Sequence, residues 1–286
     1  MTKGGGYTII ETMIFLAITL VLFGSAMSVM SGRQSSVQFT QSVRDSQSKL
    51  TDIINQVSTG YYRNDGTFTC NVTGNSAPTF DTSTPSPQGT STSCIFLGKA
   101  IKFNSGATAD KYSVFSIAAR RVTPTNKEVG SLLEALPTPI SPLTLGDGRP
   151  DMTEDLSLEF GLSVTRIVVE DDAAPRPSYG AIVFLSTLPA FQASTGTLAS
   201  GSQRVSYAAV RGSLLADSKL AAATRLSSIN DTNITQNPRS GITVCLANDS
   251  NVANATKKAM LTIGEGASQT AVRLETGFYN EALCES

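Results

Sequence analysis

The chain has 286 residues and a nearly balanced charge, with 22 basic and 23 acidic side chains. It contains no histidine and no tryptophan, so catalytic mechanisms and metal sites that require an imidazole are excluded. The balanced charge gives no support for electrostatic binding to nucleic acid, and the length allows one large domain or two small ones.

Residues 9–30 form an apolar run in which Glu11 is the only charged side chain. About 20 such residues are enough to span a bilayer as a helix. Lys3 precedes the run, and the excess of basic residues on the cytoplasmic side of membranes predicts a cytoplasmic N-terminus and an exported remainder. A carboxylate near the start of a membrane helix is costly, so we expect a cation from another chain to neutralise Glu11.

Residues 6–11, Gly-Tyr-Thr-Ile-Ile-Glu, resemble the processing site of type IV prepilins in the spacing of the short basic leader, the glycine, the acid and the apolar run. The resemblance implies that a prepilin peptidase removes residues 1–6 by cutting after Gly6. It implies that the same enzyme methylates the new amine of Tyr7. It also implies that Glu11 pairs with the amine of a neighbouring subunit during assembly on an inner-membrane platform.

Two departures and two alternatives accompany this resemblance. Tyr7 stands where the family usually has phenylalanine, and no proline occurs in residues 1–77, although many major subunits have one at the position of Ser28. A simple membrane anchor, or a signal peptide cleaved among the small residues 25–28, stays open. A signal peptide normally has a shorter apolar region free of acids, so the prepilin hypothesis is preferred.

Residues 33–58 contain neither proline nor glycine, and their apolar side chains share one helical face. Gly60 follows as a stop signal. The sequence therefore predicts one helix over residues 7–58, with a membrane and assembly part at 7–32 and an amphipathic half at 33–60. The apolar residues on the shared face are Phe39, Val43, Leu50, Ile53, Ile54 and Val57.

Residues 61–286 read as an exported β-rich head, with strand-like runs bounded by Gly, Pro, Asn or Ser. A long helix feeding an antiparallel sheet is an α+β arrangement, which the pilin resemblance also implies. A division into two lobes near residues 137–150 stays open. Strands are expected at 112–119, 162–169, 179–186, 204–210, 242–247, 259–263 and 271–274, short helices at 128–136 and 214–229, and exposed loops at 74–93 and 137–150.

The four cysteines, Cys70, Cys94, Cys245 and Cys284, favour disulfides because an even number of cysteines is typical of exported domains. Four cysteines allow three pairings, and we prefer the nearest-neighbour scheme, Cys70–Cys94 and Cys245–Cys284. No Cys-x-x-Cys spacing occurs, so no zinc site is expected.

Two acidic runs allow a weak calcium interpretation. Neither matches a twelve-residue calcium loop, so solvated loops are the preferred interpretation, and no cofactor or catalytic site is expected. The acids are Asp147, Asp151, Glu154 and Asp155 in the first run and Glu170, Asp171 and Asp172 in the second. Glycosylation stays open at five sequons, Asn71, Asn230, Asn233, Asn248 and Asn254.

These features predict a structural subunit, present in few copies, of a type IV pilus or of a pseudopilus in secretion or DNA uptake. The expected partners are prepilin peptidase, other pilin or pseudopilin subunits, the inner-membrane assembly platform and the lipid bilayer. The expected location is the cell membrane and then a surface filament. A tip adhesin or receptor-binding subunit is the alternative, and a membrane-tethered exported enzyme is the least supported because the sequence has no recognisable catalytic motif.

Overall fold

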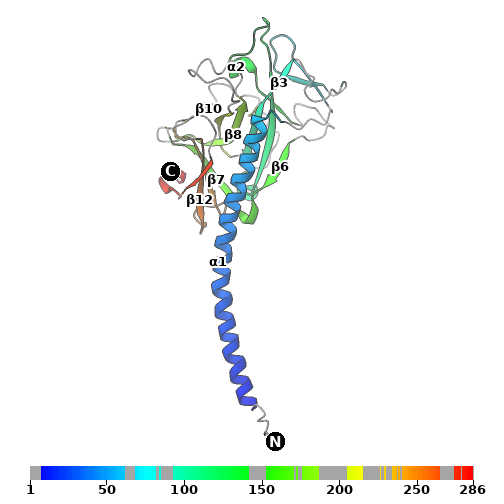
Figure 1. The fold of residues 1–286 in the computed structure, drawn as a ribbon. Coiled ribbons are helices and arrows are strands. Elements are labelled where there is room, and N and C mark those ends of the chain that lie inside the picture. Colours follow the sequence, from blue (N-terminus) through cyan, green and yellow to red (C-terminus); the bar gives the residue numbers. More distant parts are fainter. Residues whose placement is uncertain are drawn as a thin grey trace. The chain divides into compact units, whose positions relative to one another are not determined.

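The computed structural model describes residues 8–61, 68–81, 84, 93–141, 153–170, 172, 176–186, 205–214, 226, 229, 234–236, 238, 240–264, 274–277 and 279–285. The chain divides into two compact units, Met1–Gln41 and Ser42–Ser286. The division falls inside helix α1 (Ile9–Ser58), drawn in blue in Figure 1. An N-terminal apolar helix followed by mainly antiparallel sheets makes the protein α+β.

Helix α1 has a defined end at Gly60, as the sequence predicts. Gly60 adopts a positive φ of 69°, its amide donates to the Val57 carbonyl at 3.1 Å, and the Tyr61 amide donates to the Gln56 carbonyl at 2.8 Å. These two bonds form a Schellman motif, which satisfies the last carbonyls of a helix. Glycine is favoured there because it reaches positive φ without a Cβ clash.

The larger sheet, within the described residues, has seven antiparallel strands in the order β10-β9-β8-β3-β4-β5, with β6 also pairing with β4. Strands β5 and β6 share one edge of β4, opposite Ser116–Ala118 and Lys111–Val114 respectively. The strands are β3 (Cys94–Phe103), β4 (Lys111–Arg120), β5 (Thr138–Ile140), β6 (Glu154–Ser157), β8 (Tyr179–Ser186), β9 (Val205–Arg211) and β10 (Ile234–Gln236).

A second antiparallel sheet has the order β13-β12-β11-β7, and a separate hairpin pairs β1 with β2. The strands of this second sheet are β7 (Ser163–Val169), β11 (Ile242–Ala247), β12 (Lys258–Ile263) and β13 (Leu274–Gly277). The hairpin consists of β1 (Thr69–Asn71) and β2 (Thr79–Asp81). The short helices are η1 (Gly106–Thr108), α2 (Leu132–Ala135), η2 (Glu159–Gly161) and α5 (Glu281–Cys284).

The part of α1 in the second unit packs on both sheets. Val43, Leu50, Ile53, Ile54 and Val57 are buried, as the helical periodicity predicts, whereas Phe39 is half-buried. A small cavity lies where α1, the larger sheet and the second sheet meet. It is lined by Ser46 and Leu50 of α1, by Phe103 and Tyr112 of the larger sheet, by Leu158, and by Val164, Val244, Leu246 and Leu261 of the second sheet.

The opposite face of the larger sheet carries another apolar core. Side chains alternate between the two faces along a strand, so Phe115 and Ile117 lie on the face opposite to Tyr112. They are buried with Leu132 and Ala135 of α2. The larger sheet is thus covered on both faces, which explains why its central strands contain almost no exposed residues.

Six of the seven predicted strands are confirmed, with ends that agree within one residue, whereas residues 271–273 of the seventh lie outside the described residues. The helix expected at 128–136 is wrong in its first part. Glu128 forms a β-bridge with Val122, and α2 spans only Leu132–Ala135. The helix expected at 214–229 lies mostly outside the described residues.

Two expected loops contain strands. Residues 74–93 include β2, and residues 137–150 include β5, whose three residues are buried against β4. Proline in an edge strand is compatible with pairing, because its missing N–H faces away from the ladder. Strands β5 and β6, on either side of residues 141–153, belong to the same sheet. The strand β3 has no counterpart among the expected strands.

Candidate functional site

The segment Ile9–Met27 is the one stretch of the described residues that is long and apolar enough to cross a membrane. None of its residues is buried within the structure. Its hydroxyl groups donate to carbonyls of the same helix: Thr12 to Ile9 at 2.8 Å and Ser25 to Leu22 at 2.9 Å. Such bonds reduce the cost of placing a hydroxyl in lipid.

Glu11 forms a reciprocal cap with Thr8 at the start of α1. The Glu11 amide donates to Thr8 Oγ1 at 3.3 Å, while the Thr8 amide donates to Glu11 Oε2 at 3.2 Å. This is a capping box, with Thr8 as the N-cap and Glu11 three residues later. Thr8 Oγ1 also donates to Glu11 Oε2 at 3.3 Å. The sequence Thr-Ile-Ile-Glu carried this signal, but the sequence analysis did not use it.

The capping box directs the Glu11 carboxylate toward the beginning of the chain. A negative charge is favourable there because the helix dipole is positive at its N-terminus. A carboxylate has about four lone-pair sites, so it can accept a further bond while it caps its own helix. Gly6 and Tyr7, where the sequence predicts cleavage and methylation, lie outside the described residues, and so does the side chain of Ser28.

Three of the acids considered for calcium have protein partners, and Glu170, which is also described, is exposed. Glu154 pairs with Lys99 at 3.0 Å, Asp155 accepts a bond from the Ser113 hydroxyl at 2.9 Å, and Asp172 accepts one from the Tyr179 hydroxyl at 2.6 Å. Asp147, Asp151 and Asp171 lie outside the described residues. Among the residues that the structure describes, no three His, Cys, Asp or Glu side chains are grouped to hold a metal ion.

Lys99, which the sequence analysis did not single out, is fully buried beneath α1. Its ammonium group donates to Gln56 Oε1 of α1 and pairs with Glu154 of β6. Lys102, on the opposite face of β3, is also buried and donates to Asn104 Oδ1. Buried lysines are rare unless they are paired. The contacts of Lys99 join β3 to α1 and β6, whereas the bond of Lys102 is local to the end of β3.

Three polar side chains of α1, spaced by seven residues, are linked to the segment Glu154–Gly161 that contains β6 and η2, two of them directly and the third through Lys99. Ser42 Oγ donates to the Glu159 carbonyl at 2.6 Å, and Lys49 Nζ donates to the Ser157 carbonyl at 3.2 Å. Gln56 contacts Glu154 through Lys99. We call this segment the β6 strap. Residues seven apart lie on the same side of a helix, so the strap runs along α1 in the opposite direction.

Burial raises the pKa of the Tyr112 phenol well above its usual range, and the carboxylates of Asp45 and Glu154 raise it further. Burial also raises the pKa of Tyr179, with a further contribution from its hydrogen bond to Asp172. Both phenols therefore stay neutral at ordinary pH.

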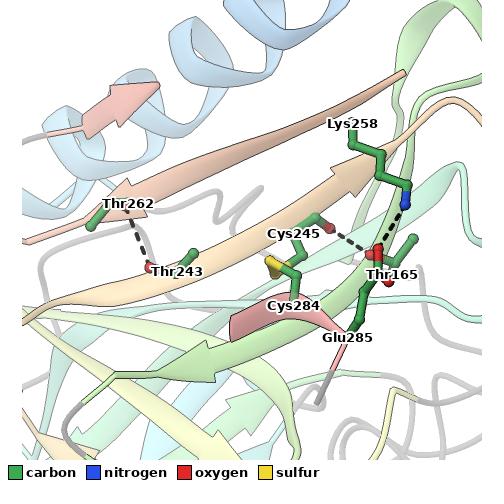
Figure 2. The surroundings of a disulfide bond; sticks show 7 residues. All are labelled: Thr165, Thr243, Cys245, Lys258, Thr262, Cys284 and Glu285. Carbon is green, nitrogen blue, oxygen red and sulfur yellow. Dashed lines mark hydrogen bonds and ion pairs between the residues drawn. A yellow bond between two sulfur atoms is a disulfide. The ribbon is translucent and has the colours of Figure 1, made fainter. Parts of the chain in front are cut away.

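The four cysteines form the disulfides Cys70–Cys94 and Cys245–Cys284, the pairing preferred in the sequence analysis. The first joins the β1–β2 hairpin to the start of β3. The second joins β11 to α5, and Figure 2 shows Cys284 facing Cys245 across the sheet surface. Both bridges join elements that backbone pairing alone does not connect.

The C-terminal disulfide lies beside an ion pair. Lys258 Nζ is 2.7 Å from Glu285 Oε1 and 5.2 Å from the centre of the Tyr279 ring. The dashed line between Lys258 and Glu285 in Figure 2 marks this ion pair. The hydrogen bond from Lys258 lowers the pKa of the Glu285 carboxyl. Burial raises the pKa of Tyr279 to about 12, with the negative charges of Glu285 and Glu281 acting in the same direction.

The described sequons differ in their accessibility. Asn71 and Asn254 are exposed. The carboxamide of Asn248 is used inside its own loop: its oxygen accepts from the amides of Thr256 and Lys257 at 3.0 Å, and its nitrogen donates to the Thr256 hydroxyl at 3.0 Å. A glycan on Asn248 would replace one hydrogen of that nitrogen. Asn230 and Asn233 lie outside the described residues.

Comparison with known proteins found no matching family model, no similar curated protein and no similar solved structure.

Proposed function

We propose that this chain is a type IV prepilin-like structural subunit of a pilus or pseudopilus. Prepilin peptidase removes residues 1–6 after Gly6, and the new amine of Tyr7 is methylated. The apolar part of α1 holds the subunit in the membrane with residues 61–286 exported, and the subunit then enters a surface filament.

The observation that carries this proposal is the position of Glu11. It is the only ionisable side chain of Ile9–Met27, and its carboxylate lies 3.2 Å from the Thr8 amide, one residue after the amine that cleavage would create. In lipid an isolated carboxylate is costly, whereas a carboxylate next to a cation is tolerated. The capping box keeps Glu11 in place to receive the amine of a neighbouring subunit.

Two further features support the proposal. Both disulfides lie in the second unit, and disulfides persist in oxidising compartments outside the cytoplasm. The amphipathic part of α1 packs on antiparallel sheets, the architecture that the prepilin resemblance implies.

Mass spectrometry of the mature N-terminus tests the processing step. We expect a chain that begins with methylated Tyr7, and Gly6→Leu should leave the leader attached. A mature terminus near Met27 would instead identify a cleaved signal peptide.

The pairing of Glu11 is tested with two matched variants. Glu11→Gln keeps a side chain that completes a capping box but removes the charge, whereas Glu11→Ala removes both. If the charge pairs with a neighbour's amine, both variants insert into the membrane and both fail to enter filaments. Normal incorporation of Glu11→Gln together with failure of Glu11→Ala would show that only the cap matters.

We also propose that the subunit is present in few copies, near a filament end. Subunits packed through their N-terminal helices lie close together, with interaxial distances of about 8–10 Å. A large head such as residues 61–286 crowds such a lattice along the shaft but not at its end. Quantitative proteomics of sheared filaments measures the copy number, and a major share of the filament mass would contradict this placement.

A further inference from the structure

Phe160 is an exposed aromatic residue with an unfavourable backbone. It lies in η2 with φ 53° and ψ 36°, and its side chain is 53% exposed. A bulky residue in the left-handed region is uncommon, and such strain persists only where the surroundings impose it. A glycine would take this conformation freely.

The backbone on both sides of Phe160 is held firmly. The Glu159 carbonyl accepts from Ser42 Oγ at 2.6 Å and from the Leu162 amide at 3.1 Å, and the Leu158 amide donates to the Asp110 carbonyl at 2.6 Å. The β6 strap therefore holds the backbone next to Phe160 against Ser42, the first residue of the second unit.

Two other large apolar side chains among the described residues that follow α1 are more than half exposed, Tyr61 and Leu133. Neither has a positive φ, whereas Phe160 does. Phe160 thus combines exposure, backbone strain and fixed presentation. The combination indicates a contact residue and not an incidental surface side chain.

We propose that Phe160 packs against the apolar segment Ile9–Met27 of a neighbouring subunit in the filament, an inference that rests on the proposed function. That segment is apolar and unburied over its 19 residues, so it offers the surface that an aromatic ring requires.

Photocrosslinking identifies the partner. All four native cysteines are in disulfides, so Phe160→Cys adds a single free thiol that a benzophenone maleimide can label. Leu133→Cys on α2 is the control, since its native side chain is 60% exposed. We expect adducts between position 160 and residues 9–27 of another subunit. We expect no adducts between position 133 and those residues. Adducts from position 160 to lipid or to another subunit's head would overturn the inference.

The variant Phe160→Gly tests whether the ring contacts a neighbouring subunit or packs within its own chain. Because glycine relieves the strain, the unfolding temperature should stay the same or rise, while incorporation into filaments falls severalfold and membrane insertion and leader cleavage are unchanged. A lower unfolding temperature would mark the ring as a packing residue and overturn the inference. If Phe160→Gly enters filaments normally and Glu11→Gln does not, the inference fails and the proposed function stands. If both enter normally, both fail.

Discussion

The two parts of helix α1 have the same backbone conformation but opposite surroundings. In Ile9–Met27 the apolar side chains are exposed and the hydroxyls bond to the helix's own carbonyls. In Ser42–Ser58 the apolar side chains are buried, and Ser42 and Lys49 bond to other elements. A single helix therefore combines an apolar segment that its own chain leaves exposed with a segment whose apolar side chains its own chain buries.

This difference predicts that substitutions in the two parts of α1 affect different measured quantities, the unfolding free energy or membrane insertion. Changes within the second unit should alter its unfolding free energy and leave membrane insertion unchanged. Changes within Ile9–Met27 should alter membrane insertion and leave the unfolding free energy of the second unit unchanged.

The largest expected effect is the loss of the C-terminal disulfide. Replacing Cys245 and Cys284 together by serine removes a bridge between residues 39 apart, and the chain-entropy model gives about 4 kcal/mol of lost stability. Chemical denaturation of the purified protein measures this change. Replacement of Cys70 and Cys94, which are 24 residues apart, is the matched control and should cost about 3 kcal/mol. A shift in membrane partitioning in either variant would contradict the prediction that changes in the second unit leave membrane insertion unchanged.

The next effect concerns the apolar segment. Ile18→Arg places a charge near the centre of Ile9–Met27, which disfavours membrane insertion by about 3 kcal/mol. Carbonate extraction should therefore release more of this variant than of the control Ile18→Leu. The unfolding temperature of the head should be the same in both. A lowered unfolding temperature would show that the two parts depend on each other.

Substitution of Lys99 tests the buried ion pair. Lys99→Ala leaves Glu154 and Gln56 without their partner, and we expect a loss of about 2 kcal/mol because Glu154 is partly exposed. Lys99→Met keeps most of the volume and should cost less than the alanine variant. Equal losses in the two variants would assign the effect to the charge. In the cycle of Lys99→Met, Glu154→Gln and the double variant, losses that simply add would contradict the pair.

The smallest effect is a pH dependence at the C-terminal end. The folded-state pKa of Tyr279 is about 12 against an ordinary value of 10.0, so folding favours the neutral phenol. Its contribution to stability is complete below pH 10.0 and is lost as the pH rises toward 12. Because the ring is partly exposed, we expect less than about 1 kcal/mol. Tyr279→Phe should reduce the alkaline slope of the unfolding free energy, and an unchanged slope would exclude Tyr279 as a source.

The sequence predicts the elements whose side chains follow a simple periodicity. The α1 stripe is of this kind. Strands such as β8 and β11 are predicted instead as short apolar runs, and they are buried along almost their whole length. Strand β3 was missed because Lys99 and Lys102 interrupt its apolar pattern. Their burial depends on partners distant in the sequence, such as Gln56 and Glu154, which no local pattern reveals.

The candidate site was predictable in part for the same reason. The capping box of Thr8 and Glu11 is a local motif that can be read from four consecutive residues. Phe160 instead follows Glu159, whose carbonyl accepts a bond from Ser42, a residue 117 positions away that no local pattern connects to it. Nothing in the residues around Phe160 indicates a left-handed backbone except the glycine that follows it.

The β6 strap has a mechanical consequence. Its contacts with Ser42, Lys49 and Gln56 run along the helix and not across it. Tension applied along the helix axis therefore loads these contacts in parallel, as a shear, so that no single bond has to break first. A pull across the axis would open them one after another, beginning at Ser42. The head should accordingly resist detachment from its helix more strongly under axial tension than under a sideways load.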